Sequence, residues 1–272
     1  MAHRQPRGRG ADRPRRQIVT DLTNRTVLIT GANRGLGVSL VDVALARGAS
    51  KVYAAARNPE MLAEAVAAAD GRVVPVRLDV TDPAQIEEAA AVGDVDLVIS
   101  NAGITCQVPI VATDNIDDFR KTMEVNYFGT MNLVRAFADQ IRSRSGGFVF
   151  ILSVAAVSLS RSAPAYSASK AATLMLASSV REELRADGVE VTVSLPGWID
   201  TDMAAALPGE KATPREVAER SIDGHLAGDA VVWPDRFAEL VRDTVDDQML
   251  DLLTRPRDVM NALAQQFTRT SA

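Results

Sequence analysis

The sequence predicts one α/β domain, in which helices cover both faces of a doubly wound parallel sheet of about seven strands, the Rossmann fold. Short apolar and β-branched runs alternate along the chain with segments of helical periodicity, and these runs are apolar nearly throughout. Strands of that kind must be covered on both faces, which is typical of a parallel sheet between two layers of helices. The expected strands are residues 26–30, 51–57, 72–78, 95–100, 148–152, 189–195 and 230–233.

Local sequence patterns indicate where the intervening helices begin and end. Asn58, Asp82 and Thr213 each precede a proline, so a capping side chain stands before a residue suited to the first helical position. Glycine follows most of the helical segments, as expected at helix C-termini. The expected helices are residues 36–47, 59–70, 83–92, 117–142, 164–186 and 214–227, and the chain beyond residue 234 has a helical pattern again.

The composition excludes several classes of protein. The 272 residues are 47% apolar and 24% charged, which is ordinary for a globular protein with a full core. A single cysteine, Cys106, excludes an internal disulfide, and with only His3 and His225 present we expect no metal site and no histidine-based triad. The net charge of −5 argues against a nucleic-acid partner, and no apolar run approaches the ~20 residues that span a bilayer. We therefore expect a cytoplasmic protein with neither a nucleic-acid nor a membrane partner.

The first residues differ in composition from the rest of the chain. Residues 1–17 contain six arginines and one acid, Asp12, and show no apolar periodicity. We interpret residues 1–20 as a solvated, disordered Arg-rich extension, with a polyanion-binding arm as the alternative. A secretory signal would need an apolar centre, and an organelle transit peptide would need serines and better amphipathic spacing. The main domain is expected over residues 21–233, with residues 234–272 as its helical C-terminal extension.

Residues 30–37 (TGANRGLG) join the first expected strand to the first expected helix. Gly31, Gly35 and Gly37 let a phosphate approach the backbone, and the helix N-terminus offers free N–H groups and a positive dipole end. This pattern indicates a dinucleotide pyrophosphate site, with an ordinary glycine-rich turn as the alternative. The turn is not a P-loop, because no Gly-Lys-Ser/Thr follows it.

The end of the second expected strand bears on the choice of cofactor. A site that prefers NAD usually has an acid here for the adenosine 2′-hydroxyl, but the strand ends in Ala55-Ala56-Arg57. Arg57 and Arg34 are suited to hold a 2′-phosphate, because a guanidinium fork matches phosphate oxygens. The sequence therefore favours NADP (NADPH), and the alternative is that both arginines are solvated loop charges.

Tyr166 and Lys170 stand four residues apart in an expected helix, which places both on one face. A free phenol titrates near pH ~10, and a neighbouring ammonium lowers that pKa by stabilising the phenolate. A tyrosine so placed can give a proton to a carbonyl oxygen or take one from an alcohol. Ser153 follows the fifth expected strand, at the carboxyl edge where such folds bind ligands. A Tyr-x-x-x-Lys spacing alone is more typical of a surface pair.

Together the motifs resemble the short-chain dehydrogenase/reductase family, over about residues 22–233. Several motifs in family order are far more specific than any one of them. The missing acid and Arg57 resemble the NADP-preferring branch, whereas the N-terminal extension and the residues after Trp233 depart from the family pattern. After the glycine turn come Asp79-Val80, Asn101-Ala102-Gly103, Asn126, Ser153, Tyr166, Lys170 and Pro196-Gly197-Trp198-Ile199-Asp200-Thr201.

The resemblance implies a catalytic role at four positions. Tyr166 would be the catalytic acid/base, and Lys170 would bind the nicotinamide ribose and depress the tyrosine pKa. Ser153 would orient the substrate carbonyl, and Asn126 would hold a water in the proton relay. The implied catalytic residues are therefore Asn126, Ser153, Tyr166 and Lys170.

The resemblance also implies how the cofactor is bound. Asp79 would meet the adenine, the backbone of residues 101–103 would line the ribose, and residues 196–201 would cover the nicotinamide. The implied cofactor-binding residues are Gly31, Asn33, Arg34, Gly35, Leu36, Gly37, Arg57, Asp79, Val80, Asn101, Ala102, Gly103, Tyr166, Lys170, Pro196, Gly197, Ile199 and Thr201.

These features predict a carbonyl reductase, an oxidoreductase that uses NADPH to reduce a ketone or aldehyde with Tyr166 as proton donor. The reverse reaction, NAD(P)⁺-dependent oxidation of a secondary alcohol, uses the same groups and is the alternative. A non-catalytic nucleotide-sensing protein on this fold is a remoter alternative, since such proteins typically lose the tyrosine or the lysine. The resemblance further implies a homodimer or homotetramer, paired through residues 117–142 and the helix of Tyr166.

The loops expected around the site bear on the substrate. Residues 104–115, 154–164 and 203–212 are mostly small and apolar, which favours a small carbonyl or alcohol substrate of low charge. Arg161 and Lys211 would face an acidic substrate in the alternative interpretation, although solvated loop charges describe them better.

Overall fold

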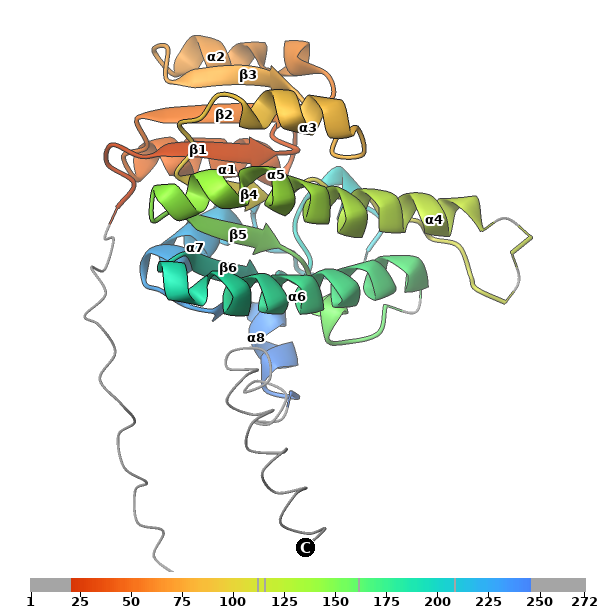
Figure 1. The fold of residues 1–272 in the computed structure, drawn as a ribbon. Helices are drawn as coiled ribbons and strands as arrows, with labels where there is room; N and C mark the ends of the chain where they lie inside the picture. Colours follow the sequence, from red (N-terminus) through yellow and green to blue (C-terminus); the bar gives the residue numbers. More distant parts are fainter. Residues whose placement is uncertain (1–20, 112, 115, 161, 208, 246–272) are drawn as a thin grey trace, which may run out of the picture.

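The computed structural model describes residues 21–245 except residues 112, 115, 161 and 208. The expected N-terminal extension, Arg161 and the chain from residue 246 onward lie outside the described residues. Parallel strands form one seven-stranded sheet in the order β3-β2-β1-β4-β5-β6-β7 (Figure 1), which confirms the doubly wound α/β fold. The strands are β1 (Thr26–Thr30), β2 (Lys51–Ala56), β3 (Val73–Arg77), β4 (Leu97–Ser100), β5 (Gly147–Ile151), β6 (Glu190–Ser194) and β7 (Val231–Val232).

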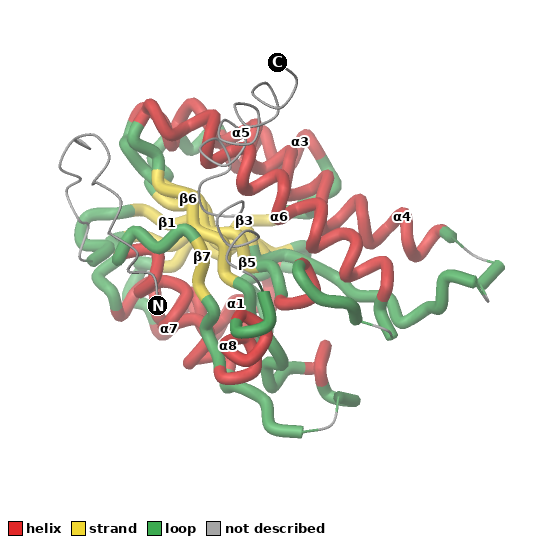
Figure 2. Tube along the Cα trace, turned by 90° about the horizontal axis from the view of Figure 1, so that it is seen from below, coloured by secondary structure: helices red, strands yellow, loops and turns green. Residues whose placement is uncertain are grey.

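Helices cover both faces of the sheet (Figure 2). On one face pack α1 (Leu36–Ala46), α2 (Ala63–Ala68) and α7 (Pro214–Leu226). On the other face pack α3 (Pro83–Ala90), α5 (Gly129–Ser143) and α6 (Pro164–Leu184). Helix α8 (Arg236–Arg242) follows β7. Within the part of the chain that the structure describes, no helix is both long and apolar enough to cross a membrane.

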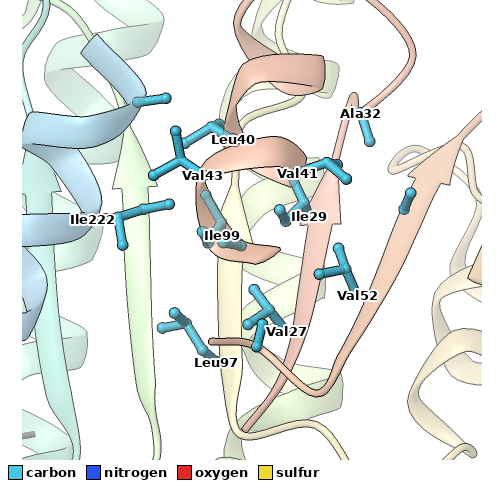
Figure 3. Close-up of a cluster of buried hydrophobic side chains, with 14 of the residues drawn as sticks. Val27, Ile29, Ala32, Leu40, Val41, Val43, Val52, Leu97, Ile99 and Ile222 are labelled. Atoms are coloured by element: carbon cyan, nitrogen blue, oxygen red, sulfur yellow. The ribbon is translucent and has the colours of Figure 1, made fainter. Parts of the chain in front are cut away.

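Successive residues of the central strands serve opposite faces of the sheet. In β1, Val27 and Ile29 belong to the core beneath α1, whereas Leu28 belongs to the core on the other face. Figure 3 shows Val27 and Ile29 in the same buried cluster as Leu40, Val41 and Val43 of α1. Because helices bury both faces, every position of the strand must be apolar, and the strand therefore appears in the sequence as a continuous apolar run.

The expected helix over residues 117–142 contains a π-helical turn. Helix α4 (Asp117–Met123) leads into this turn (Glu124–Phe128), and α5 follows it. A Cβ on Gly129 would lie 2.8 Å from Val80 Cγ2, so the helix packs directly on the loop after β3. Within the turn, the Asn126 carbonyl accepts a hydrogen bond from the Thr130 hydroxyl at 2.9 Å. The long helix expected over these residues is therefore present, and the π turn within it is a feature that helical periodicity does not report.

Two of the three expected helix caps form. The Asp82 carboxylate accepts hydrogen bonds from the backbone N–H groups of Ala84 and Gln85 at the start of α3. The Thr213 hydroxyl accepts from the Glu216 N–H at 3.1 Å at the start of α7. Asn58 makes no side-chain cap, and a 3₁₀ turn (Pro59–Leu62) precedes α2 instead of regular α-helix.

His225 lies partly buried in the last turn of α7, against β5 and β6. Its Nδ1 is 3.0 Å from the Thr192 hydroxyl oxygen, and its Cε1 is 2.6 Å from the position that a Cβ on Gly147 would take. Burial lowers the pKa of His225 from its ordinary value of 6.5 to about 4, because the surrounding protein disfavours the charged ring.

This pKa makes a specific contribution to acid sensitivity. Between pH 6.5 and about 4 the unfolded chain binds a proton at His225 that the folded protein does not, so the free energy of unfolding falls as pH falls. We expect a loss of up to about 3 kcal/mol from this residue. The measurement is urea unfolding at several pH values across this window, with His225→Gln as the matched non-titrating variant. Equal losses of stability in the two proteins would contradict the assignment.

Candidate active site

The sequence-predicted site residues follow the carboxyl ends of six strands. Because all the strands are parallel, these ends share one edge of the sheet, which brings together residues that are far apart in the chain. They are the glycine turn after β1, Arg57 after β2, Asp79 and Val80 after β3, residues 101–103 after β4, Ser153 after β5 and residues 196–201 after β6.

The glycine turn is tied to the end of β4. The Thr30 hydroxyl accepts hydrogen bonds from the backbone N–H groups of Asn101 and Ala102, both at 3.0 Å. In return, the Asn101 side chain donates to the carbonyl oxygens of Thr30 and Gly31, at 2.9 and 3.2 Å. The expected ribose-lining segment and the expected phosphate turn are thus held as one unit.

The conformation of the turn suits a pyrophosphate. Gly31 and Gly35 have φ of +65° and +52°, and a Cβ on Gly37 would lie 2.0 Å from the Gly31 carbonyl oxygen, so only glycine fits there. No side chain of the described residues caps the N-terminus of α1. The Gly37 N–H donates to the Arg34 carbonyl oxygen at 3.1 Å, so an anion here would be bound by the other first-turn N–H groups and by the positive end of the helix dipole.

A cavity of about 370 Å³ lies where the adenine end of a dinucleotide is expected. The Asp79 carboxylate, one of its walls, accepts hydrogen bonds from both the backbone N–H and the hydroxyl of Thr81, at 2.9 and 2.8 Å. Arg57 lines the same cavity, whereas Arg34, expected to share its site, is not among the lining residues. The lining residues are Arg57, Asp79, Thr81, Arg120, Lys121, Glu124 and Val125.

Arg34 has a partner of its own. Its guanidinium lies 3.5 Å from the carboxylate of Asp202, and both side chains are largely exposed. A solvent-exposed ion pair is weak, so Arg34 remains able to exchange this partner for a phosphate.

Four other residues predicted to bind the cofactor are buried or make a single contact within the protein. Leu36 is buried under the turn, and Val80 is buried against Gly129. Ile199 pairs with Ala212 in a β-bridge. The Asn33 side chain is directed to Met61, with its amide nitrogen 3.4 Å from the sulfur.

Ser153, Tyr166 and Lys170 meet beside this edge of the sheet. The Ser153 side chain acts on the Tyr166 hydroxyl to lower its pKa, and the Ser153 hydroxyl accepts from the Ala155 N–H at 3.1 Å. Lys170 is 5% exposed, and its Nζ lies 5.5 Å from the centre of the Tyr166 ring. The same Nζ donates a hydrogen bond to the Ile151 carbonyl oxygen at 3.0 Å.

Burial shifts both titratable groups toward their neutral forms. It raises the pKa of Tyr166 to about 12, although the neighbouring Ser153 side chain acts in the opposite direction. It lowers the pKa of Lys170 to about 8. The expected depression of the tyrosine pKa by Lys170 is therefore corrected for the protein alone. The Lys170 ammonium faces the Tyr166 ring and donates to the Ile151 carbonyl. Desolvation of the Tyr166 hydroxyl therefore has a larger effect on the tyrosine pKa than the charge of Lys170 has.

Asn126 joins three segments of the site. Its side-chain oxygen accepts from the Ile104 N–H, and its amide nitrogen donates to the Ile104 carbonyl and to the Ser169 hydroxyl, all at 2.9 Å. Its carbonyl accepts from the Thr173 hydroxyl at 3.1 Å. Asn126 thereby connects the loop after β4 with α6, the helix that carries Tyr166 and Lys170.

Sequence reasoning missed several residues that hold the site together. Ser169, within the Tyr166–Lys170 turn, binds Asn126 and donates to the Tyr166 carbonyl at 2.8 Å. Thr30 and Asp202 were also given no role of their own. For Ser169, its place between Tyr166 and Lys170 was a signal in the sequence. Thr30 and Asp202 had no such signal, because each contacts residues that are far away in the chain.

Comparisons with known proteins agree with this geometry. Residues 25–212 match the family described as short chain dehydrogenase. The chain is 33% identical over 216 residues to the ketoacyl reductase HetN of Nostoc sp., covering 74% of this chain and 75% of that protein. It is 32% identical over 232 residues to 1-deoxy-11-beta-hydroxypentalenate dehydrogenase of Streptomyces exfoliatus, covering 79% of this chain and 82% of that protein.

A solved structure is similar over most of the chain. It is a short chain dehydrogenase from Burkholderia cenocepacia J2315 in complex with NADP, which superposes with a TM-score of 0.78 at 36% identity. The alignment covers 86% of this chain and 99% of that chain, so the likeness extends well beyond the glycine turn.

The connections through Asn126 predict a large effect on stability. Asn126→Leu leaves the N–H and carbonyl of Ile104 and the Ser169 hydroxyl without this partner, so we expect the free energy of unfolding to fall by about 2–4 kcal/mol. Asn132→Leu is the matched control on α5, since the described residues give its side chain no hydrogen bond, and we expect a change within about 0.5 kcal/mol. The measurement is chemical denaturation of both variants. A loss at Asn126 no larger than that at Asn132 would refute the role.

Proposed function

The chain belongs to the short-chain dehydrogenase family, and we propose that it is an NADPH-dependent reductase that converts a ketone or aldehyde to an alcohol. One observation carries this proposal most directly. The buried Lys170 has its Nζ 5.5 Å from the centre of the Tyr166 ring and 3.5 Å from the position that a Cβ on Gly103 would take, at the same edge of the sheet as Ser153 and the glycine turn. A proton donor is thus placed where a nicotinamide and a carbonyl substrate would meet.

The residues suggest how the reaction proceeds. NADPH, when bound, supplies a hydride to the carbonyl carbon. Ser153 holds the carbonyl oxygen by a hydrogen bond, and the Tyr166 hydroxyl gives that oxygen its proton, so that one hydride and one proton yield the alcohol. A protonated Lys170 then stabilises the phenolate by its charge, and its pKa of about 8 lets it exchange a proton near neutral pH.

The pKa of Tyr166 fits the proposed reduction near neutral pH, whereas the cellular ratio of NADPH to NADP⁺ sets the direction of the reaction. At about 12, this pKa keeps the phenol protonated, which is the form that a proton donor needs. Oxidation of a secondary alcohol requires the phenolate and is the second candidate, to be favoured as pH rises. A non-catalytic nucleotide-sensing role is disfavoured because Tyr166 and Lys170 are both present.

The proposed cofactor is NADP. Fit is supported by the uncapped start of α1 for the pyrophosphate and by the cavity at Asp79 for the adenine. Arg57 reaches this cavity, and Ala56 occupies the position where an NAD site has its acid. The Burkholderia structure in complex with NADP, at 36% identity, supports the same choice.

The proposed substrate is a small carbonyl compound of low charge. Large apolar side chains are exposed on the loops beyond β4, β5 and β6, including Ile110, Leu159 and Met203. The names of two relatives, a ketoacyl reductase and a 1-deoxy-11-beta-hydroxypentalenate dehydrogenase, support a carbonyl or alcohol group as the reacting part of the substrate.

We extend the proposal to a homodimer or homotetramer that pairs through α5 and α6. On α6, Leu174 and Ala177 are buried in the core, but Met175 is 53% exposed, and Phe128 beside α5 is 41% exposed. These apolar groups are what a second copy would cover. The cytoplasmic location stays a prediction from the sequence.

Removing the proposed proton donor tests the reaction. Tyr166→Phe keeps the ring and loses the hydroxyl, so we expect turnover to fall about 10²–10⁴-fold. The NADPH dissociation constant is expected to stay within about twofold, because the change is worth little in binding free energy. Turnover is followed by NADPH absorbance with a panel of apolar ketones and aldehydes, and Tyr127→Phe is the control. Near wild-type turnover in Tyr166→Phe would overturn the assignment.

Replacing the proposed 2′-phosphate residues tests the cofactor. We expect NADPH to be preferred over NADH by roughly 10- to 1,000-fold in kcat/KM, because a guanidinium gains charge-assisted bonds only to a phosphate. The double variant Ala56→Asp with Arg57→Gln is expected to shift this ratio toward NADH by about tenfold or more. Arg72→Gln is the control, because Arg72 precedes β3 and so lies at the opposite edge of the parallel sheet from Arg57, which follows β2. Equal use of both cofactors by the wild type, or an unmoved ratio in the double variant, would show that these arginines are solvated loop charges.

A further inference from the structure

The peptide group between Pro196 and Gly197 is held on both sides. The Pro196 carbonyl oxygen accepts a hydrogen bond from the Val154 N–H at 2.9 Å. The Gly197 N–H donates to Asp235 Oδ2 at 2.7 Å. Since Val154 directly follows Ser153, the orientation of this peptide group is coupled to the end of β5, where the substrate oxygen is proposed to be held.

Residues 196–202, which we call the strap, reach from this point to the glycine turn. Thr201 Cγ2 lies 3.1 Å from the position that a Cβ on Gly35 would take, and Asp202 pairs with Arg34 at 3.5 Å. Between these ends, the Trp198 carbonyl accepts from the Ala212 N–H at 2.9 Å. The strap therefore has one end against the proposed pyrophosphate turn and the other against Asp235.

Asp235 lies immediately before α8 and is 2% exposed. Its Oδ1 accepts from the Ala238 N–H at 2.9 Å and caps the helix, while Oδ2 serves Gly197. Phe237, in the first turn of α8, stacks on Trp198 with ring centres 4.8 Å apart and an interplanar angle of 19°. The start of α8 thus holds two successive residues of the strap. Asp235 holds Gly197 by a charge-assisted hydrogen bond, and Phe237 holds Trp198 by an aromatic contact.

Glycine at position 197 makes this contact both possible and necessary. A Cβ there would lie 2.7 Å from Asp235 Oδ1 and from Phe237 Cδ1, so the close approach requires glycine. Glycine restrains its own backbone least of all residues. The conformation at the start of the strap therefore depends on Asp235 and Phe237 rather than on local preference.

We propose that Asp235 is a positioning residue for the cofactor, which holds the strap in the conformation that receives NADPH. This inference rests on the proposed function. Asp235 acts through Gly197 and does not itself meet the reacting atoms. Helix α8, which follows the last strand of the sheet, then serves to fix one wall of the cofactor site.

The test compares two variants of α8 in the full chain. Asp235→Ser retains a side chain that caps helices well but is too short to reach the Gly197 N–H. Glu239→Ala is the matched control, because it removes the 3.0 Å ion pair of α8 with Arg220 on α7 and leaves the strap untouched. NADPH binding is measured by calorimetry. Acrylamide quenching of Trp198 without cofactor, in a Trp233→Phe background, reports on the strap directly.

We expect Asp235→Ser to raise the NADPH dissociation constant about tenfold, since a charge-assisted hydrogen bond to the strap is lost. Quenching of Trp198 should increase in this variant and stay unchanged in Glu239→Ala. Unchanged affinity and quenching in a folded Asp235→Ser would overturn the inference, as would equal effects in the control. Should Asp235→Ser fail to fold, Phe237→Leu decides in the same way by its NADPH affinity. A wild type that binds no NADPH would instead refute the proposed function.

Discussion

The hydrogen bonds of Asn126 connect the loop after β4, the start of α5 and the middle of α6. Through its side chain it holds the backbone of Ile104 on one side and the Ser169 hydroxyl on the other. The π turn around it lets the Asn126 carbonyl accept from the hydroxyls of Thr130 and Thr173. Ser169 lies between Tyr166 and Lys170. Because Asn126 holds the Ser169 hydroxyl, the placement of both proposed catalytic groups depends on Asn126. The π turn thus accompanies the placement of the Asn126 side chain where these three segments meet.

Desolvation dominates the electrostatics of the proposed active site. Tyr166 and Lys170 are both shifted toward neutral forms, to about 12 and about 8, so the protein alone does not create a phenolate. The neighbouring Ser153 side chain opposes this shift of the tyrosine pKa only in part. A site built this way keeps its proton on the donor until a carbonyl oxygen accepts it, which is the protonation state that reduction needs.

The proposed cofactor site is formed by segments that lie far apart in the sequence and contact one another in the fold. The glycine turn is fixed by Asn101 from the end of β4, and it meets the strap at Thr201. The strap is in turn fixed by Asp235 at the start of α8. Few of these contacts are local, so the shape of the site depends on the whole sheet bringing strand ends to one edge.

The sequence by itself determined the seven strands, their parallel arrangement and the glycine turn proposed to bind the pyrophosphate. These features follow from local causes: continuous apolar runs for strands buried on both faces, prolines and capping residues at helix starts, and glycines where a Cβ has no room. The position of Ser153 at the carboxyl edge also follows, since parallel strands end together, and the spacing of four residues places Tyr166 and Lys170 on one face of a helix.

Only the tertiary structure decided how these residues are tuned and held. The π turn at Asn126, the pairing of Arg34 with Asp202 and the reach of Asp235 to Gly197 join residues that no sequence periodicity relates. The direction of the Tyr166 pKa shift depended on how much protein surrounds the hydroxyl and on where the Lys170 ammonium points. Such quantities depend on distances between distant parts of the chain, and those distances exist only once the sheet and its helices have packed.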